Sequence, residues 1–409
     1  MRKSCTILQV ATHSTLVPIH GGQLRSHNNG RVLEAAGYTV RGIAACFRQD
    51  HDIDNDREAI LDIRTVLPNW KGGVARGAFD DYFACAAVEE NPTLRTKFFH
   101  LTEAARPDIV LLEHPWLWPL VRLIPEVAKG KVPVVYDSHN VELHLKERIV
   151  QELRLDAGEL SQAEELLSAT ERLEQELVTS AAAVTACTTK DAQVFEAWGA
   201  RRTVVAGNGS HRRPTTGLRR PFPSLLPRDC RYALMVGSEW PPNITGFENL
   251  VLPFLALLRP GQRVVAAGGV SEAVRRRLAE QGASWALEGR LTLLGRISDL
   301  ALSALIENAG CIIIPIEYGG GSNIKTAEAL LTDRRVVASA VAMRGFDQFL
   351  NVPGLTVADG PKAFGMAVRD ALADSSPPPS RAASVAVLTW DATLAPLVAL
   401  VGDLTDAAG

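Results

Sequence analysis

A glycine-rich segment, IEYGGGSNIKTAEALL at residues 316–331, gathers several groups that could bind a nucleotide. The spacing predicts a helix with Lys325 and Glu328 on one face, because residues three apart are neighbours on a helix surface. Glycines let an anion approach the backbone, and the first N–H groups of a helix attract negative charge. Lys325 would then meet a diphosphate, and Glu328 would accept hydrogen bonds from a ribose diol. The alternative is an ordinary turn capped by Ser322 or Asn323, in which Lys325 and Glu328 only pair with each other.

A histidine follows an apolar run in the segment YDSHN, residues 136–140. Ligands of open α/β sheets bind beyond the carboxyl ends of the strands. This position therefore favours a functional role for His139, although a lone histidine is more often structural. His114 in LEHPW is the second candidate, and Trp116 beside it could line a sugar or lipid surface.

Two further segments carry weaker signals. In HGGQLRSHNN, residues 20–29, Gly22 would allow close approach of a ligand and Arg25 could meet an anion, but a plain turn explains the segment equally well. In HDIDNDRE, residues 51–58, two D-x-D patterns could hold a divalent metal, although a solvated loop is the better interpretation. The candidate metal ligands in this second segment are Asp52, Asp54 and Asp56.

The elements that position these residues alternate between short apolar runs and longer helical patterns. This alternation indicates parallel sheets covered by helices on both faces. Residues 141–180, rich in Glu and Leu, predict one or two exposed amphipathic helices, and residues 385–404 predict an apolar helix. The expected strands lie at 5–11, 39–46, 108–114, 132–140, 182–188 and 203–210, and then at 232–238, 263–269, 291–296, 311–317 and 334–341.

Prolines and arginines concentrate at residues 211–230 and predict a linker between two α/β halves. A chain of 409 residues is also long enough for two domains of about 200 residues each. We therefore expect a first domain at 1–210, the linker at 211–230, a second domain at 231–380 and a final helical segment at 381–409.

Composition limits the classes of partner. The net charge of −3 gives no general attraction to nucleic acid. Six widely spaced cysteines without a CxxC pair suggest neither zinc nor disulfides, which fits a reducing cytoplasm. No apolar run approaches the roughly 20 residues that span a bilayer, and polar residues interrupt the start, so we expect no signal peptide and at most a peripheral contact with the inner face of the membrane.

Several of these segments together resemble GT-B glycosyltransferases of family 4. PIEYGGGSNIKTAEALLTDRRVVASAVAMRGFD looks like the donor-binding segment of that family, GSEWPPNITGFENL resembles the first strand of its second domain, and LLGRISD resembles its GR-sd element. GNGS, CTTKDAQVF and YDSHN also have similar counterparts, in the same order and with similar spacing.

The resemblance implies two Rossmann-like domains facing across a cleft, with a C-terminal helix crossing back to the first domain. It further implies sugar transfer from a nucleotide sugar to a hydroxyl of a sugar, lipid-linked or small-molecule acceptor, with retention and without a metal or other cofactor. His139 matches the active-site histidine of the family, and Arg25, His114 and Trp116 would lie on the acceptor side. The implied donor-binding residues are Gly22, Arg296, Ile297, Gly319, Gly320, Gly321, Ser322, Asn323, Lys325 and Glu328.

The chain departs from the family pattern at two positions. Gly320 stands where many members have a first glutamate, eight residues before Glu328, and the usual lysine after the first glycine of the second domain is missing in NITGF. Arg296 and Lys325 are then left to hold the diphosphate. A nucleotide-sugar 2-epimerase of the same fold and a non-catalytic nucleotide-sugar binder therefore remain alternatives.

Overall fold

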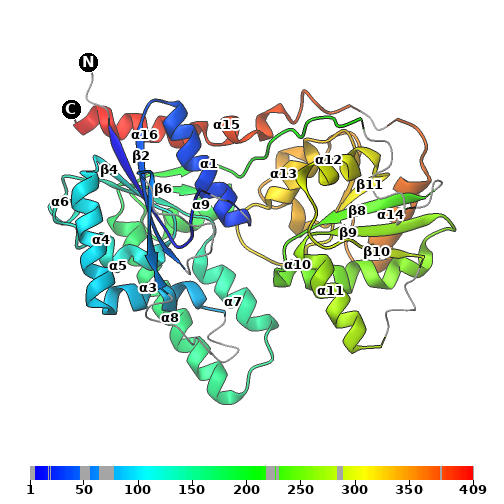
Figure 1. Cartoon of the computed structure of the whole chain (residues 1–409), viewed down its shortest axis with the longest axis horizontal. Helices are drawn as coiled ribbons and strands as arrows, with labels where there is room; N and C mark the ends of the chain where they lie inside the picture. The colour runs from blue at the N-terminus through cyan, green and yellow to red at the C-terminus, as the bar shows by residue number, and fades with distance from the viewer. Residues whose placement is uncertain are drawn as a thin grey trace. The chain divides into compact units, whose positions relative to one another are not determined.

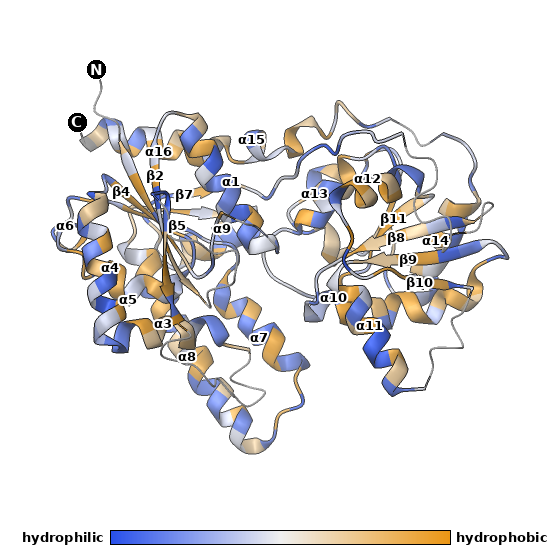
Figure 2. Ribbon diagram, viewed as in Figure 1, coloured by the Kyte–Doolittle hydropathy of each residue, from blue (hydrophilic) through white to orange (hydrophobic). Residues whose placement is uncertain are grey.

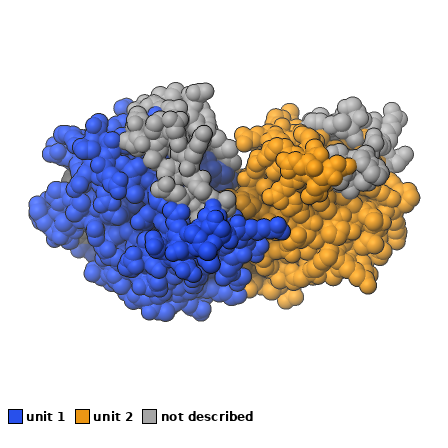
Figure 3. All heavy atoms as spheres, turned by 90° about the horizontal axis from the view of Figure 1, so that it is seen from below, with its two compact units in different colours: residues 1–208, 393–409 blue, residues 209–392 orange. Residues whose placement is uncertain are grey.

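The computed structural model describes residues 5–16, 18, 20–46, 56–63, 78–217, 226, 230–282, 289–377 and 380–408. The chain divides into two compact units, which are coloured separately in Figure 3. Unit 1 comprises Met1–Asn208 and Thr393–Gly409, and unit 2 comprises Gly209–Ala392.

Figure 1 shows unit 1 as a sheet with helices around it. This parallel sheet has seven strands in the order β3-β2-β1-β4-β5-β6-β7. The predicted apolar runs all form strands, whereas β3 was not predicted, because its short sequence EAILD follows a polar stretch. The strands are β1 Thr6–Ala11, β2 Thr39–Cys46, β3 Glu58–Asp62, β4 Ile109–Leu112, β5 Val134–Asp137, β6 Ala183–Ala186 and β7 Thr203–Val205.

Helices surround this sheet, and its central strands are buried on both faces, which explains their continuous apolar sequences. The predicted helical region 141–180 forms two helices, α7 and α8. Asp156 begins α8 through a capping box with Glu159, in which each side chain accepts a hydrogen bond from the other residue's backbone N–H. The helices are α1 Gly21–Ala35, α3 Asp80–Glu90, α4 Pro92–Ala105, α5 Trp118–Val121, α6 Pro125–Ala128, α7 Glu142–Glu152, α8 Ala157–Ser180, α9 Thr189–Ala197 and α16 Ala395–Ala408, with a 3₁₀ turn η2 at Pro115–Leu117.

Unit 2 has a six-stranded parallel sheet with the order β10-β9-β8-β11-β12-β13. Apolar clusters cover both of its faces, and Figure 2 shows the hydrophobic character of its strands. The sequence analysis missed β13, a three-residue edge strand that is largely exposed. The strands are β8 Arg231–Val236, β9 Gln262–Ala267, β10 Leu291–Leu293, β11 Cys311–Ile314, β12 Arg335–Ala338 and β13 Leu355–Val357.

The helices of unit 2 include a π-helical segment, η3, between an α-helical and a 3₁₀-helical segment. The α-helices are α10 Pro241–Gly246, α11 Gly269–Glu280, α12 Asp299–Asn308, α13 Ile324–Leu330, α14 Pro361–Ala373 and α15 Trp390–Thr393, and the other helical segments are η3 Phe247–Val251, η4 Leu252–Leu257, η6 Val341–Met343, η7 Asp347–Phe349 and η8 Ala386–Leu388.

The C-terminal segment returns to unit 1, as the sequence predicts, and α16 contacts α1 and β7 there. An ion pair of 2.6 Å between Arg202 and Asp403 joins this helix to the start of β7. The prediction of one helix over 385–404 is wrong, because η8, α15 and α16 are separate. Pro396 lies in the first turn of α16, the part of a helix where proline is tolerated. Within the described ranges, no helix combines the length and apolar character needed to cross a membrane.

Candidate functional site

Histidines from separate segments come together at the carboxyl end of the sheet in unit 1. His13 follows β1, His114 follows β4 and His139 follows β5, and these three strands are neighbours in the sheet. The ring centroids of His114 and His139 are 4.2 Å apart, and His13 lies 5.4 Å from His114 and 5.4 Å from His20. His139 therefore lies at the end of a strand, as predicted, and its ring belongs to a larger cluster of imidazole rings.

A buried glutamate at the end of β4 holds His139. The Oε2 atom of Glu113 is 2.9 Å from Nε2 of His139, and Glu113 is fully buried. Glu113 also accepts hydrogen bonds from the side chains of Gln9, Ser26 and Asn29. The sequence analysis missed Glu113, although its position in LLEH at a strand end was a usable signal.

Burial controls the charges of this cluster. It lowers the pKa of His139 to about 3, which keeps the imidazole neutral, and it also lowers the pKa values of His13 and His114 well below their ordinary range. Burial, with the nearby Asp137 charge, raises the pKa of Glu113 to about 8. Burial alone would also raise the pKa of Asp137, but Arg25 lowers it overall through its charge and hydrogen bonds.

Gly22 lies next to the free side of His139. A Cβ atom added to Gly22 would be 3.6 Å from Nδ1 of His139, 3.5 Å from His13 and 3.6 Å from His20. His20 caps α1 by accepting a hydrogen bond from the backbone of Gln23. Gly22 is in the first turn of α1, where backbone N–H groups have no partner within the helix. The position is therefore lined by three histidine rings, with room beside them for a group the size of a methyl.

The prediction that Arg25 meets an anion is contradicted by its placement. Arg25 is 1% exposed, and its guanidinium donates to Asp137 at 2.6 and 2.8 Å. It also donates to the carbonyl oxygen of Ala206 at 2.9 Å and to Asn208 at 3.2 Å. All three guanidinium nitrogens are engaged, so Arg25 joins α1 to β5 and to the end of β7 instead of facing a ligand.

His114 and Trp116 are not arranged as an exposed lining. Trp116 is 3% exposed and packs near Tyr82, while Nζ of Lys146 lies 5.4 Å from the Trp116 ring. Nδ1 of His114 and Nε1 of Trp116 are buried and make no hydrogen bond. An unpaired buried polar group typically costs about 1–3 kcal/mol, so both atoms are placed to gain from a ligand or water partner.

In the described part of unit 1, one group of side chains is close enough together to hold a metal ion. Potential ligand atoms of Glu113, Asp137 and His139 lie within 4.8 Å of one another. Arg25 already supplies the positive charge beside Asp137, and amide and hydroxyl donors bind the oxygens of Glu113. Of the D-x-D residues, Asp52 and Asp54 lie outside the described residues.

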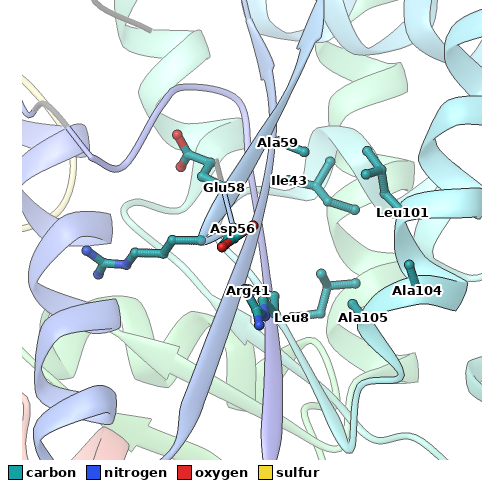
Figure 4. Close-up of a pocket in the computed structure, with 11 residues that line it drawn as sticks. Leu8, Arg41, Ile43, Asp56, Glu58, Ala59, Leu101, Ala104 and Ala105 are labelled. Carbon is teal, nitrogen blue, oxygen red and sulfur yellow. The ribbon is translucent and has the colours of Figure 1, made fainter. Parts of the chain in front are cut away.

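A cavity of about 300 Å³ occupies another part of unit 1 (Figure 4). It lies between α4, represented by Leu101 and Ala104, and the strand residues Ile43 and Ala59. Asp56, the third D-x-D residue, also lines it. None of the clustered histidines lines it, so this cavity is separate from the histidine cluster.

In unit 2, the predicted glycine turn connects β11 to α13. Gly319 and Gly321 have φ values of 144° and 55°, which L-residues with side chains rarely adopt. Arg344 donates to the carbonyl oxygens of Gly319, Gly320 and Gly321 at 2.6, 2.5 and 2.6 Å. In a trans peptide the N–H points opposite to the carbonyl. The N–H groups of the next residues therefore point away from Arg344, as an anion site requires.

Asn323 caps α13 by accepting a hydrogen bond of 3.1 Å from the backbone of Lys325, and Ser322 is buried. Burial lowers the pKa of Lys325, whereas the Glu328 carboxylate raises it. Both side chains line a small cavity over β8 and β11. Asn323 therefore caps the helix, as the alternative interpretation expected, and Lys325 lies beside it as the predicted positively charged residue.

Glu328 forms its ion pair with a linker residue. Nε of Arg213 is 2.7 Å from Oε1 of Glu328, and its NH1 atom is 3.5 Å from Asp299. The sequence analysis used the arginines of residues 211–230 only as an indication of a linker. The contact spans 115 residues, and no local pattern could have revealed it.

Arg296 and Ile297 follow β10. The Arg296 side chain is exposed, while its backbone N–H donates to Glu272 at 3.3 Å. Ile297 is partly buried against the apolar cluster of unit 2. Arg296 is therefore accessible to an anion, and Ile297 anchors its loop.

Comparisons with known proteins find a family match for part of the chain and solved structures of the same fold. Residues 20–209 match the glycosyl transferase 4-like domain family, and no curated protein sequence matches the chain. Sucrose-phosphate synthase from Thermosynechococcus elongatus is 16% identical with a TM-score of 0.72, and the match covers 98% of this chain and 100% of that one.

Two further solved structures cover nearly the whole chain. The catalytic domain of starch synthase IV from Arabidopsis thaliana, bound to ADP and acarbose, is 10% identical with a TM-score of 0.64 and covers 99% of each chain. HepE from Anabaena, in complex with UDP and glucose, is 14% identical with a TM-score of 0.59 and covers 98% of each chain.

Proposed function

We propose that this chain, which has the fold of solved GT-B glycosyltransferases and matches the glycosyl transferase 4-like domain family over residues 20–209, transfers a sugar from a nucleotide sugar to an acceptor hydroxyl. The solved structures of the same fold with UDP and with ADP support a nucleoside diphosphate as the leaving group. The family resemblance supports retention of the anomeric configuration.

The glycine turn of unit 2 is the observation that carries the proposal. Arg344 fixes three consecutive carbonyl groups, and the following N–H groups point the other way. Together with Lys325 and Arg296, these donors suit a diphosphate, whose negative charge increases as the glycosidic bond breaks. Donors fixed in advance stabilise such charge without reorganisation. Glu328 retains its proposed role as the acceptor for the ribose hydroxyls.

His139 is proposed to contact the transferred sugar. Its neutral imidazole and its opening beside Gly22 suit a hydrogen bond to a hydroxyl group. The reaction is proposed to need no metal, because Lys325 and Arg296 provide positive charge for the diphosphate. We also propose that the protein is cytoplasmic, that its acceptor is lipid-linked and that it makes a peripheral contact with the membrane.

A thermal-shift screen with nucleotides and nucleotide sugars tests the function first, because a ligand stabilises the folded state according to its affinity. Product analysis with the stabilising nucleotide sugar then separates three outcomes. Nucleotide released only with an acceptor supports transfer. An isomerised sugar without an acceptor indicates an epimerase, and binding without turnover indicates a non-catalytic binder, the alternative that Gly320 in place of a glutamate favours.

A further inference from the structure

A chain of hydrogen bonds links two histidines of unit 1 through Glu113. Nε2 of His13 is 3.0 Å from Oγ of Ser26, and this hydroxyl donates to Oε2 of Glu113 at 2.9 Å. The same carboxylate oxygen lies 2.9 Å from Nε2 of His139. The chain connects the loop after β1, helix α1 and the ends of β4 and β5.

Glu113 has little freedom to move within this chain. Gln9 of β1 binds its Oε1 atom, and Asn29 of α1 lies 3.2 Å from Oε2. With Ser26 and His139, four side chains bind one fully buried carboxylate. A carboxylate surrounded by donors in this way has a fixed position, and it fixes the partner that depends on it.

His139 makes its described hydrogen bond through Nε2 alone, so the bond to Glu113 determines the state of the whole ring. When a carboxylate accepts a hydrogen bond from the N–H of one ring nitrogen, the other nitrogen of the neutral imidazole is an acceptor. That other nitrogen, Nδ1, lies beside Gly22, in a space between the rings of His13 and His20 that would accept a group the size of a methyl.

We propose that Glu113 is a positioning residue for His139, holding the proton on Nε2 so that Nδ1 can accept a hydrogen bond from a hydroxyl group of the substrate. The substrate part of this inference rests on the proposed function. The ring placement rests on the contacts alone. Glu113 itself acts only through His139.

A double-mutant cycle with Glu113→Gln and His139→Ala tests the dependence. We expect Glu113→Gln to lower kcat on the order of 10- to 100-fold, as expected for the loss of a hydrogen bond to a charged group. It should add nothing once His139 is alanine, because residues that act as a unit are not additive. The affinity for free nucleoside diphosphate should stay within about threefold in both variants.

Glu174→Gln is the matched control. Glu174 is another fully buried glutamate of unit 1 with a pKa raised by burial to about 8, and its hydrogen bonds are to Tyr136 and to backbone N–H groups of α7. This variant should keep the wild-type kcat. A wild-type kcat in Glu113→Gln, or an undiminished effect of Glu113→Gln in the His139→Ala background, overturns the proposal.

A second measurement needs neither turnover nor a folded Glu113 variant. In wild-type protein with ¹⁵N-labelled histidine at pH 9, the ring signals of His139 are identified by their loss in His139→Ala. We expect the proton on Nε2 and none on Nδ1. A protonated Nδ1 overturns the proposal even if sugar transfer is established. Failure of every nucleotide sugar to react would instead remove the proposed function, and the ¹⁵N spectrum would still test the placement of the His139 ring.

Discussion

Single charged side chains in both units are held by partners far away in the sequence. Glu113 holds His139 across 26 residues, Arg344 binds the glycine carbonyls 23 to 25 residues before it, and Arg213 holds Glu328 across 115 residues. In each case the residue expected to meet the ligand has a predetermined orientation. Substitution of the partner should therefore affect function without removing the ligand-binding group.

Glu328→Gln should weaken binding of the nucleotide sugar while the protein remains folded. Loss of a charge-assisted hydrogen bond costs on the order of 1.5–3 kcal/mol, which corresponds to roughly a 10- to 150-fold increase in Kd. Calorimetry with the nucleotide sugar measures this change. Glu317→Gln is a suitable control, because Glu317 accepts a hydrogen bond from Asn249 and is exposed. An unchanged Kd in Glu328→Gln would remove Glu328 from the site.

The pH dependence of the reaction should reflect Glu113. The groups that face it keep one charge state near neutrality, because His139 and His13 have lowered pKa values, Asp137 has a lowered pKa and Arg25 stays protonated. Burial raises the pKa of Glu113 to about 8, so its carboxyl group holds a proton below that pH and loses it above.

The ionised Glu113 can only accept the hydrogen bond from Nε2–H, whereas the protonated carboxyl group can instead donate to Nε2 and move the ring proton to Nδ1, so kcat/KM should rise between pH 6.5 and 9. Glu113→Gln should lack this rise. A flat wild-type profile, or the same rise in Glu113→Gln, would contradict the assignment. The raised pKa also means that the folded state retains a proton which the unfolded state has lost, so this group lowers the free energy of unfolding as the pH increases from about 5 to 8.

At the scale of elements, the first turn of α1 gives a prediction that separates folding from function. A methyl group at Gly22 meets only ordinary van der Waals contacts of 3.5–3.6 Å, so Gly22→Ala should fold normally. Replacing glycine by alanine in a helix gains roughly 0.5–1 kcal/mol. The methyl group would nevertheless fill the space beside Nδ1 of His139, and kcat should fall at least 10-fold.

Gly158→Ala is the matched control for that variant. Gly158 is the second residue of α8, as Gly22 is the second residue of α1, and its added Cβ would meet only Asp156 at 3.4 Å. Thermal unfolding should show similar Tm changes in both variants, and steady-state kinetics should show a loss only for Gly22→Ala. Equal activity of the two would mean that the space beside Gly22 is not used.

The sequence predicts elements better than it predicts contacts. Buried parallel strands such as β5 and β11 are visible because both faces require apolar residues. Edge strand β13 lacks that requirement and was missed, whereas β3 was missed because its short apolar sequence follows a polar stretch. His139 and the glycine turn were identified because their positions at strand ends are local features. Glu113, Arg213 and Arg344 depend on contacts across the fold, which no local pattern specifies.

For the molecule as a whole, the distribution of charge between the units bears on metal use. In unit 1 the buried carboxylates are bound by Arg25 and by amide and hydroxyl donors, whereas unit 2 presents Arg296 and Lys325 beyond its strands. Turnover should therefore survive excess EDTA, which initial rates with and without the chelator measure. Loss of turnover that manganese or magnesium restores would instead assign a metal to Asp52, Asp54 and Asp56.

The central claim is that unit 2 binds the diphosphate while His139 of unit 1 serves the transfer step. Comparison of Lys325→Ala with His139→Ala, by calorimetry with free nucleoside diphosphate and by steady-state kinetics, tests it most directly. Lys325 meets a charge present in substrate and product, so its loss should weaken nucleoside diphosphate binding and reduce turnover. His139→Ala should lower kcat and kcat/KM together, as expected for an interaction made in the transition state, and leave nucleoside diphosphate affinity within a few-fold of wild type. Equal loss of nucleoside diphosphate affinity in the two variants would contradict the account.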